Sequence, residues 1–364
     1  DQQQAEARKP FFLHLATGAA HAPHQVPPEW VTPYVGQFDE GWEAWRQRVF
    51  DRQVAAGVVP EGTVLTPRPE WVPDWATLPE DQRGLFARYM EVFAGFLTHT
   101  DHHLGRLFDF LDQRGIADDT IVMVLSDNGA SAEGGVSGTL NEAAGWLGQQ
   151  EDVADSVTRV DEIGGHDAFN HYPFGWAWAG NTPLRLWKRY AWLGGVRTPL
   201  VVRWGDRIPD PGAIRPQFCH AVDLFSTILD AAGLSVPAAV DGVTQQPVDG
   251  VSLLPSLTDA GAAEHRDLQY FEMMGSRGLY HRGWKAVTDF VPNQFGEREV
   301  LPGSHDFTTD RWSLFRLEDD FAESQDVSEE HPDVVRRLEE LWWAEAGRNQ
   351  VLPLFSFPDS MAHM

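Results

Sequence analysis

The stretch IVMVLSDNGASAEGG, from Ile121 to Gly135, decides the fold, because an apolar run breaks there into a polar turn. Its first five residues are apolar and mostly branched, which predicts a strand buried on both faces of a parallel sheet. Asp127, Asn128 and Gly129 follow at once, and this tripeptide alone is a common turn signal. In open parallel sheets, however, ligand-binding groups collect beyond the carboxyl ends of the strands. The stretch therefore predicts either a plain turn or one edge of a binding site.

The segments around this strand predict an α/β domain. Apolar residues recur every three or four positions between Leu85 and Leu111, as in an amphipathic helix that Gly115 ends. That helix leads directly into the strand at 120–126, in the order of a parallel α/β unit. Further predictions are a short buried strand at 10–16 (PFFLHLA), an irregular stretch to about residue 78, a helix start at 181–183 (NTP), a strand in GGVRTPLVVRW at 194–204 and a helix in HAVDLFSTILDAAG at 220–233.

Beyond Gly233 the pattern changes. DLQYFEMMG, RGLYHR, WKAVTDF and WSLFRLE are short runs separated by turns with no helix between them, which predict an antiparallel meander. The helical sequence HPDVVRRLEELWWAEAG is expected to cover this meander. We therefore expect a large α/β domain at 1–260, a small antiparallel α+β subdomain at 261–350 and a tail at 351–364.

Composition limits the classes of partner. The 364 residues are 42% hydrophobic, enough for a large core, and carry a formal net charge of -26. Such a charge repels nucleic acid and anionic membranes, and no apolar run is long enough to span a bilayer. An anionic small substrate would need a locally positive site. The oligomeric state cannot be inferred from composition.

The first residues, DQQQAEARKP, include neither an initiating Met nor the basic and apolar regions of a signal peptide. We therefore expect the chain to begin within a longer protein, which leaves the compartment undecided. The single cysteine, Cys219, cannot form an internal disulfide and is expected to be buried and inert.

Four residues at predicted strand ends are candidates for a positive site. Asp127 and Asn128 offer one anionic and one neutral oxygen, which suit a hard cation such as Ca²⁺ or Mg²⁺. His21 follows the predicted strand at 10–16. Lys188, one of only three lysines beside 25 arginines, precedes GGVRTP. Together they predict a cationic crevice on an acidic protein.

Five motifs in order resemble the sulfatases of the alkaline phosphatase superfamily, and most of all large bacterial arylsulfatases. They are HLATGAAHAPHQVP, VMVLSDNGASAEGG, NTPLRLWKRYAWLGGVRTPLVVRW, HAVDLFSTILDAAG and WSLFRLEDDFAESQDVSEEHP. The resemblance covers nearly the whole chain. It implies an α/β/α sandwich like that of alkaline phosphatase, with a mostly parallel sheet, followed by a small antiparallel sheet and a C-terminal helix.

The resemblance also implies a chemistry: Ca²⁺-dependent hydrolysis of a small sulfate ester, in which a formylglycine hydrate attacks sulfur. Asp127 and Asn128 match the second pair of metal ligands, with Asp127 also placed to help deprotonate the nucleophile. His21 and Lys188 match the residues that contact the sulfate and the leaving-group oxygen. Mg²⁺ is the less favoured metal.

The sequence also departs from the family pattern. The formylglycine motif C-x-P-S-R is absent, since Cys219 lies in FCHAV, and so are an early acidic pair, the arginine beside the nucleophile and a first lysine/histidine pair. All belong upstream of residue 1 in the family. We therefore expect the central and C-terminal part of a sulfatase, with part of the catalytic domain missing from 1–260 and no activity in this chain alone.

Other candidates have plainer interpretations. His99, His102 and His103 are expected to be solvated helix residues, His24 a loop residue, and LEDDFAESQD at 317–326 a charged turn. Four tryptophans near the expected site either form an aryl pocket or pack in the core: Trp176, Trp178, Trp187 and Trp192. Two alternative functions stay open, a phosphate or phosphonate monoester hydrolase on the same scaffold and a non-catalytic binding protein.

Overall fold

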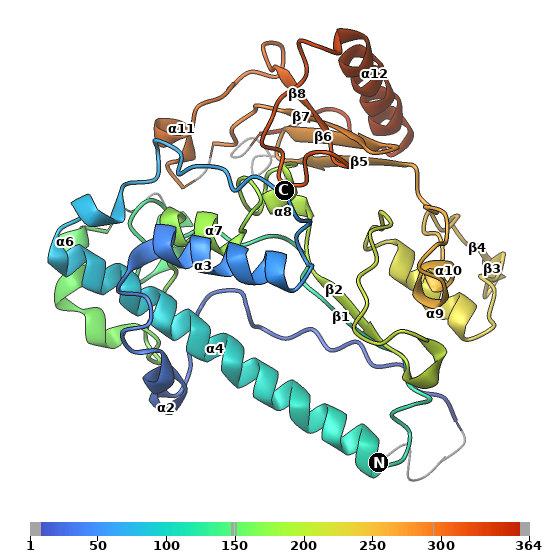
Figure 1. Ribbon diagram of the computed structural model, residues 1–364, viewed down its shortest axis with the longest axis horizontal. Helices are drawn as coiled ribbons and strands as arrows, with labels where there is room; N and C mark the ends of the chain where they lie inside the picture. The colour runs from blue at the N-terminus through green and yellow to red at the C-terminus, as the bar shows by residue number, and fades with distance from the viewer. Residues whose placement is uncertain (1–8, 147–148, 150, 294, 357–364) are drawn as a thin grey trace.

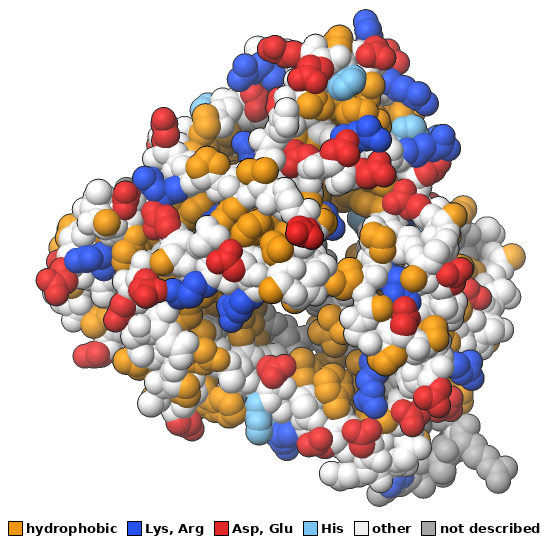
Figure 2. All heavy atoms as spheres, in the orientation of Figure 1, with side chains coloured by type: hydrophobic (Ala, Val, Ile, Leu, Met, Phe, Trp, Pro, Cys, Tyr) orange, Lys and Arg blue, Asp and Glu red, His pale blue; other side chains and the backbone are white. Residues whose placement is uncertain are grey.

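The computed structural model describes residues 9–146, 149, 151–293 and 295–356. Helix α4, Glu80–Gln113, runs along one side of the molecule, and α3, Gly41–Ala55, and α7, Phe174–Gly180, lie beside it (Figure 1). A four-stranded sheet covered by α12, Pro332–Arg348, lies at the opposite end (Figure 1). Acidic side chains are scattered over the whole visible face (Figure 2). No helix in the described ranges combines the length and apolarity needed to cross a membrane.

The helix predicted between Leu85 and Leu111 is confirmed as α4, and Gly115 follows its end with φ +65°. Helix α3 was not predicted, since the region before residue 78 had been expected to be irregular. Its buried positions are few, namely Gly41, Trp42 and Arg46, so it shows little of the apolar periodicity by which a helix is recognised. Trp42 is fully buried and packs edge-to-face on Trp75 and Trp176 in the main core.

The strand after α4 exists, but its neighbour and its burial differ from the prediction. Strand β1, Val122–Leu125, pairs antiparallel with β2, Leu200–Arg203. Val124 and Leu125 are 41% and 42% exposed, so the expectation of a strand buried on both faces is wrong. A single partner strand covers only one edge, and no other described strand joins this pair.

The buried strand predicted at 10–16 is also wrong. These residues form no strand, and the side chains of Phe11, Phe12, Leu13 and Leu15 are exposed, Phe12 by 73%. A strand needs a hydrogen-bonded neighbour, and none of the described strands pairs with this segment. Its apolar composition alone therefore misled the prediction.

The antiparallel meander is confirmed, but the expectation of no helix between its strands is wrong, because the short helix α11, Glu297–Val300, lies between the last two strands. Strands β5, Leu268–Met273, β6, Ser276–His281, β7, Trp284–Thr288, and β8, Trp312–Arg316, pair in chain order. Helix α12 packs on this sheet through Leu338, Trp342 and Ala346, which join Leu279, Ala286 and Leu314 in a separate core cluster. Trp342 also donates a 3.0 Å hydrogen bond to the carbonyl of Phe271.

Shorter elements connect these parts. The helix predicted at 220–233 is confirmed as α9, Asp223–Ala231, with Gly233 after it at φ +65°. The remaining short helices are α2, Pro28–Val31; α5, Glu142–Trp146; α6, Val153–Thr158; α8, Leu193–Val196; α10, Leu254–Thr258; and α11, Glu297–Val300. There are also 3-10 turns at Thr32–Tyr34, Trp75–Thr77, Val160–Glu162 and Gly205–Arg207, and a two-residue hairpin of β3, Ala239–Val240, and β4, Val243–Thr244.

Candidate active site

His21 and Lys188, 167 positions apart in the chain, meet at one place. His21 lies in a turn closed by its backbone N–H on the carbonyl of Gly18, at 3.0 Å. Its Nδ1 lies 2.8 Å from the carbonyl of Ala22, which can only accept, so Nδ1 carries the proton and Nε2 presents its lone pair. The Lys188 ammonium lies 3.3 Å from that Nε2 and donates to it.

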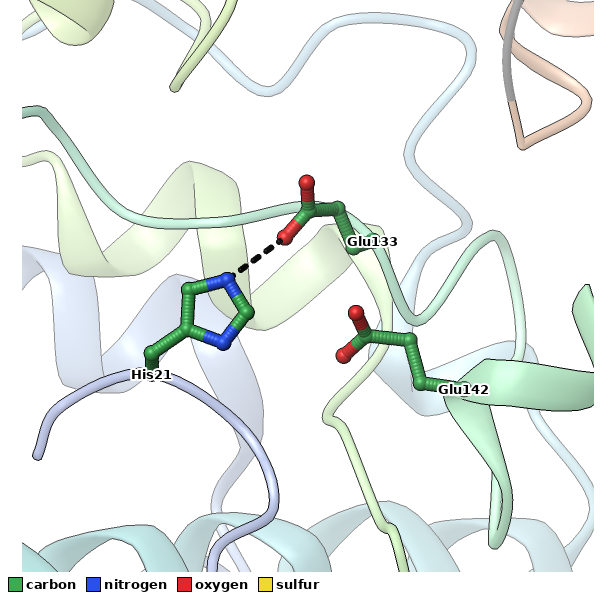
Figure 3. Close-up of side chains that lie close together, drawn as sticks. All are labelled: His21, Glu133 and Glu142. Atoms are coloured by element: carbon green, nitrogen blue, oxygen red, sulfur yellow. Dashed lines mark ion pairs between the residues drawn. The ribbon is translucent and has the colours of Figure 1, made fainter. Parts of the chain in front are cut away.

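Glu133 contacts both residues of this pair, and Figure 3 shows its contact with His21. Its Oε2 accepts from Lys188 Nζ at 3.0 Å and from Ser131 Oγ at 2.9 Å, and lies 3.6 Å from His21 Nε2. Burial of Glu133 favours the neutral acid, but the Lys188 ammonium, together with the Arg189 charge and the Ser131 hydrogen bond, outweighs this effect and lowers the pKa of Glu133. Glu133 is therefore an ionised carboxylate that fixes the Lys188 side chain.

Glu142, the first residue of α5, points toward the same group (Figure 3). It is 1% exposed, and neither carboxylate oxygen has a hydrogen-bond partner in the described part of the chain. Burial, and after it the Glu133 charge, raise the pKa of Glu142 to about 7. Its backbone N–H donates to the carbonyl of Phe169 at 2.9 Å, which anchors the start of α5.

Close backbone packing positions Lys188 against the loop that follows β1. The Lys188 N–H donates to the carbonyl of Ala130 at 3.0 Å, and the Gly129 N–H donates to the carbonyl of Gly195 at 3.0 Å. A Cβ on Gly129 would lie 1.6 Å from the carbonyl oxygen of Gly194, so only glycine allows this approach. The DNG stretch is therefore more than a surface turn, since its glycine joins the two loops.

Asn181 has a different role from the predicted one. Instead of starting a helix it caps the end of α7, and residues 181–192 are irregular. Its side chain accepts from the Ala130 N–H and donates to the carbonyl of Leu186, both at 2.8 Å. The helix-start prediction was wrong because a helix N-cap and a loop-bridging asparagine use the same short polar side chain.

Asp127 and Asn128 lie just beyond β1, at the strand end where the sequence places them. Asp127 is exposed and Asn128 half-buried, and the Asn128 carbonyl accepts from Ser126 Oγ at 2.9 Å. Their side chains are hard oxygen donors that fit Ca²⁺, but they give two of the six to eight ligands that this ion takes. Among the described residues, the group of ligand-type side chains within 4.8 Å of one another is His21, Glu133 and Glu142, without Asp127.

Residues 185–195 form the Lys188 segment. On the side away from His21 and Glu133, two buried glutamates hold this segment. Glu297 Oε1 accepts from Trp187 Nε1 at 2.8 Å and from Arg189 Nη2 at 2.9 Å. Glu323 pairs with Lys285 and accepts from the Leu193 N–H at 2.7 Å. Both glutamates are fully buried. They connect the segment to the C-terminal part of the chain.

The structure places the remaining candidates as follows. His24 is buried and stacks on Tyr172, and Glu323 within the expected charged turn is buried as well. Cys219 is exposed, so the prediction of a buried thiol is wrong, since it lies in the coil before α9 rather than on the inward face of that helix. The four tryptophans all pack in the main core. His99 and His103 lie on one face of α4, with their Nε2 atoms 3.1 Å apart.

Sequence reasoning missed Glu133, Glu142 and His171. Glu133 and Glu142 are the only charged residues between Asp127 and Glu151, in a segment otherwise rich in Gly, Ser and Asn. Isolated acidic residues in such a segment were the available signal. His171 is buried beneath the same loop, where burial lowers its pKa to about 4, and no pattern in the sequence marks it.

Comparisons with known proteins place the chain in a family. A model of the sulfatase family matches residues 1–234, and a model of the C-terminal part of N-sulphoglucosamine sulphohydrolase matches 185–344. An uncharacterized sulfatase of Schizosaccharomyces pombe is 28% identical over 93% of this chain and 58% of its own length. An arylsulfatase of Klebsiella aerogenes is 30% identical over 67% of this chain and 51% of its own length.

A solved sulfatase from Pseudoalteromonas superposes with a TM-score of 0.44 at 16% identity, covering 86% of this chain and 53% of that one. The chain spans about half the length of the curated relatives that it matches. The sulfatase model, by contrast, matches well over half of the chain itself. The chain therefore belongs to the sulfatase family of the alkaline phosphatase superfamily and has its α/β fold, followed by a small antiparallel sheet.

Proposed function

We propose that the protein containing this chain is an arylsulfatase-type sulfuric ester hydrolase. The observation that supports this most directly is the contact between His21 and Lys188, whose side-chain nitrogens lie 3.3 Å apart. Two nitrogens at that separation suit adjacent oxygens of one tetrahedral anion, with Lys188 as one donor and His21 as the second donor when Nε2 also carries a proton. A protonated Lys188 also supplies the positive charge that an acidic protein needs at a sulfate site.

Lys188 is proposed to donate to the bridging or leaving-group oxygen as the S–O bond breaks. Its ammonium is already held by Glu133 at 3.0 Å, which restricts its rotamers. His21, with its proton fixed on Nδ1, offers Nε2 on the same side and contacts sulfate by donating once it is doubly protonated. Glu133 acts through Lys188 and is therefore a positioning residue.

A metal ion is part of the proposal, because two carboxylates beside one ammonium leave the group without net positive charge. Asp127 and Asn128 would hold Ca²⁺, which supplies Lewis-acid polarisation and charge neutralisation for the sulfate when bound. The exposed Asp127 carboxylate is accessible to such an ion. The nucleophile is proposed to be a formylglycine outside these 364 residues, since Cys219 is followed by His-Ala-Val and not by x-Pro-Ser-Arg.

The test measures kcat/KM of the full-length protein on aryl sulfates of graded leaving-group pKa. Lys188→Ala is expected to lose a factor of about 10² to 10⁴ on esters with poor leaving groups and much less on nitrophenyl sulfate. Lys188→Arg should not rescue the loss, because the planar guanidinium cannot take the place of the compact ammonium. Lys9→Ala, at an exposed lysine, is the matched control.

An unchanged dependence on leaving-group pKa in Lys188→Ala would remove Lys188 from leaving-group chemistry. The same preparations are assayed on aryl phosphonate monoesters. A higher kcat/KM on those esters than on every sulfate would replace the proposal with phosphonate hydrolysis on the same scaffold. Absence of turnover on either class in a formylglycine-bearing preparation would favour a binding protein.

A further inference from the structure

We propose that His21, Glu133 and Glu142 form a binding site for a divalent transition-metal ion, Zn²⁺ in the first place. The site uses neither of the proposed Ca²⁺ ligands, Asp127 and Asn128. Its donors are one imidazole nitrogen and two carboxylates, contributed by the turn at His21, the loop after β1 and the first turn of α5 (Figure 3). The inference rests on this geometry and not on the proposed sulfatase activity.

The distances suit a small ion after minor rotation of the side chains. All three ligand atoms lie within 4.8 Å of one another, and His21 Nε2 is 3.6 Å from Glu133 Oε2. Zinc bonds of about 2.0 to 2.2 Å in a tetrahedral site place ligand atoms roughly 3.3 to 3.6 Å apart. The His21–Glu133 edge already has this length, and the Glu142 ligand atom lies within 4.8 Å of the other two.

Glu142 supplies an independent observation in favour of a ligand. It is 1% exposed, both its oxygens lack a hydrogen-bond partner among the described residues, and it points toward His21 and Glu133 (Figure 3). A buried carboxylate without a partner is costly in free energy, because it has given up its hydration and gained nothing in exchange. A bound cation would satisfy it.

His21 is also prepared as a metal ligand. Its Nδ1–H donates to the Ala22 carbonyl at 2.8 Å, which fixes the tautomer and leaves the lone pair on Nε2, 3.6 Å from Glu133 Oε2. A backbone carbonyl on the far nitrogen is a common arrangement behind metal-bound histidines. The mixed nitrogen and carboxylate donor set favours Zn²⁺ over Ca²⁺, because Ca²⁺ prefers oxygen ligands alone.

Lys188 is the internal competitor for this site. Its ammonium lies 3.0 Å from Glu133 Oε2 and 3.3 Å from His21 Nε2, so it occupies the same two partners that the ion would take. The side chain is 20% exposed and can rotate toward solvent. Metal and ammonium are therefore mutually exclusive, and a bound Zn²⁺ would also take His21 away from an anionic ligand.

The experiment titrates the full-length protein with Zn²⁺ and with Ca²⁺ by calorimetry. It uses a His103→Ala background, because His99 and His103 form an exposed pair with nitrogens 3.1 Å apart that can bind Zn²⁺ independently. One equivalent of Zn²⁺ is expected. Glu142→Gln, which keeps the shape of the side chain, should weaken Zn²⁺ binding by about a hundredfold or more, since even loss of a supporting group costs roughly 10- to 100-fold.

Lys188→Met gives the opposite result under this proposal. Removing the competing ammonium should tighten Zn²⁺ binding by at least about tenfold. Asp167→Asn, at a carboxylate 96% exposed, is the control and should change nothing. Zn²⁺ affinity unaltered by Glu142→Gln, weakened by Lys188→Met, or matched by Ca²⁺ at this site would overturn the proposal. Glu133→Gln repeats the test if the Glu142 variant does not fold.

Discussion

The two sides of the Lys188 segment differ in how their charges are satisfied. On the side of the C-terminal sheet, Glu297 and Glu323 are fully buried, and both accept hydrogen bonds from the segment. On the side of His21, Glu133 is paired with Lys188 but Glu142 has no partner in the described structure. The comparison indicates that the side of the C-terminal sheet holds the backbone in place. The side of His21, by contrast, keeps a carboxylate that is unpaired among the described residues and can bind a ligand.

The backbone conformation near Lys188 supports this difference between the two sides. Leu186 and Arg189, on either side of Lys188, have φ values of 57° and 82°, a region that non-glycine residues rarely adopt. Such conformations persist only where surrounding contacts over-determine them. Glu297 provides two of these contacts, through Trp187 and Arg189. Contacts on the side of the C-terminal sheet therefore stabilise the unfavourable backbone conformation that presents Lys188 to the other side.

Removing Glu323 should have the largest effect. Glu323→Ala leaves the Lys285 ammonium buried beside the Ala191 carbonyl without its anionic partner, and it also removes the acceptor of the Leu193 N–H. We expect a loss of about 3 to 5 kcal/mol in the free energy of unfolding, the usual cost of breaking one partner from a buried pair. Urea denaturation measures it.

A double variant separates a lost pair from lost packing. Lys285→Met with Glu323→Leu replaces both charges by apolar groups and should recover most of the stability, because the desolvation penalty disappears with the charges. If the double variant were as unstable as Glu323→Ala, the Leu193 contact rather than the ion pair would be what stabilises the segment.

Glu297→Gln is the second largest expected effect. The amide oxygen can still accept from Trp187, but the Arg189 guanidinium, 4% exposed, loses its negative partner. We expect about 2 to 3 kcal/mol of destabilisation, below the full cost because a hydrogen-bond acceptor remains. The result should change little between low and high salt, since a buried pair is poorly screened. A strong salt dependence would place the pair in solvent contact.

On the side of His21, the prediction concerns His171 and the pH dependence of the free energy of unfolding. Burial lowers its pKa to about 4, against about 6.5 for an unperturbed histidine. The folded protein therefore binds the proton less readily than the unfolded chain, so this stability is full above pH 6.5 and is lost progressively as pH falls toward 4. Between pH 7 and pH 5 the loss should be about 2 kcal/mol.

His171→Gln should remove that pH dependence, measured as the difference in unfolding free energy between wild type and variant at each pH. His166→Gln is the matched control, because its side chain is 96% exposed and close by in sequence. Parallel pH curves for wild type and His171→Gln would show that His171 does not titrate with folding in this range.

The sequence predicted those elements whose partners are close along the chain. Strands β5 to β8 and α12 were correct, because each strand pairs with its sequence neighbour and the helix covers them directly. The strands expected at 10–16 and 121–125 failed in structure or burial, because an apolar run does not specify which neighbour covers it. Among the strands, the local sequence pattern was therefore sufficient only where each strand pairs with its neighbour along the chain.

The site was predicted in part for a similar reason. The family motifs indicated His21 and Lys188, and the structure brings these two together, while their assigned roles stay a prediction. Glu133 and Glu142 were not singled out, since a lone glutamate carries no periodic signal. Their placement depends on non-local contacts, such as Glu142 N–H on Phe169 and Lys188 N–H on Ala130. Those contacts exist only once the loops have packed.

The smallest expected effect comes from a surface pair with the same chemistry as Arg189 and Glu297. Arg282 donates from Nε and Nη2 to Asp267 Oδ2 at 3.0 and 2.7 Å, but both side chains are more than half exposed. Asp267→Asn should therefore cost about 0.5 kcal/mol or less, and high salt should remove even that, because solvent screens the pair and two mobile side chains lose entropy in forming it. Urea denaturation of Asp267→Asn and Glu297→Gln at low and high salt measures the two losses in unfolding free energy. The charged groups are of the same kind in both pairs, so the comparison isolates the effect of burial. Equal losses for the two variants would mean that burial does not decide the strength of these pairs, and the distinction between the two sides of the Lys188 segment would then need another cause.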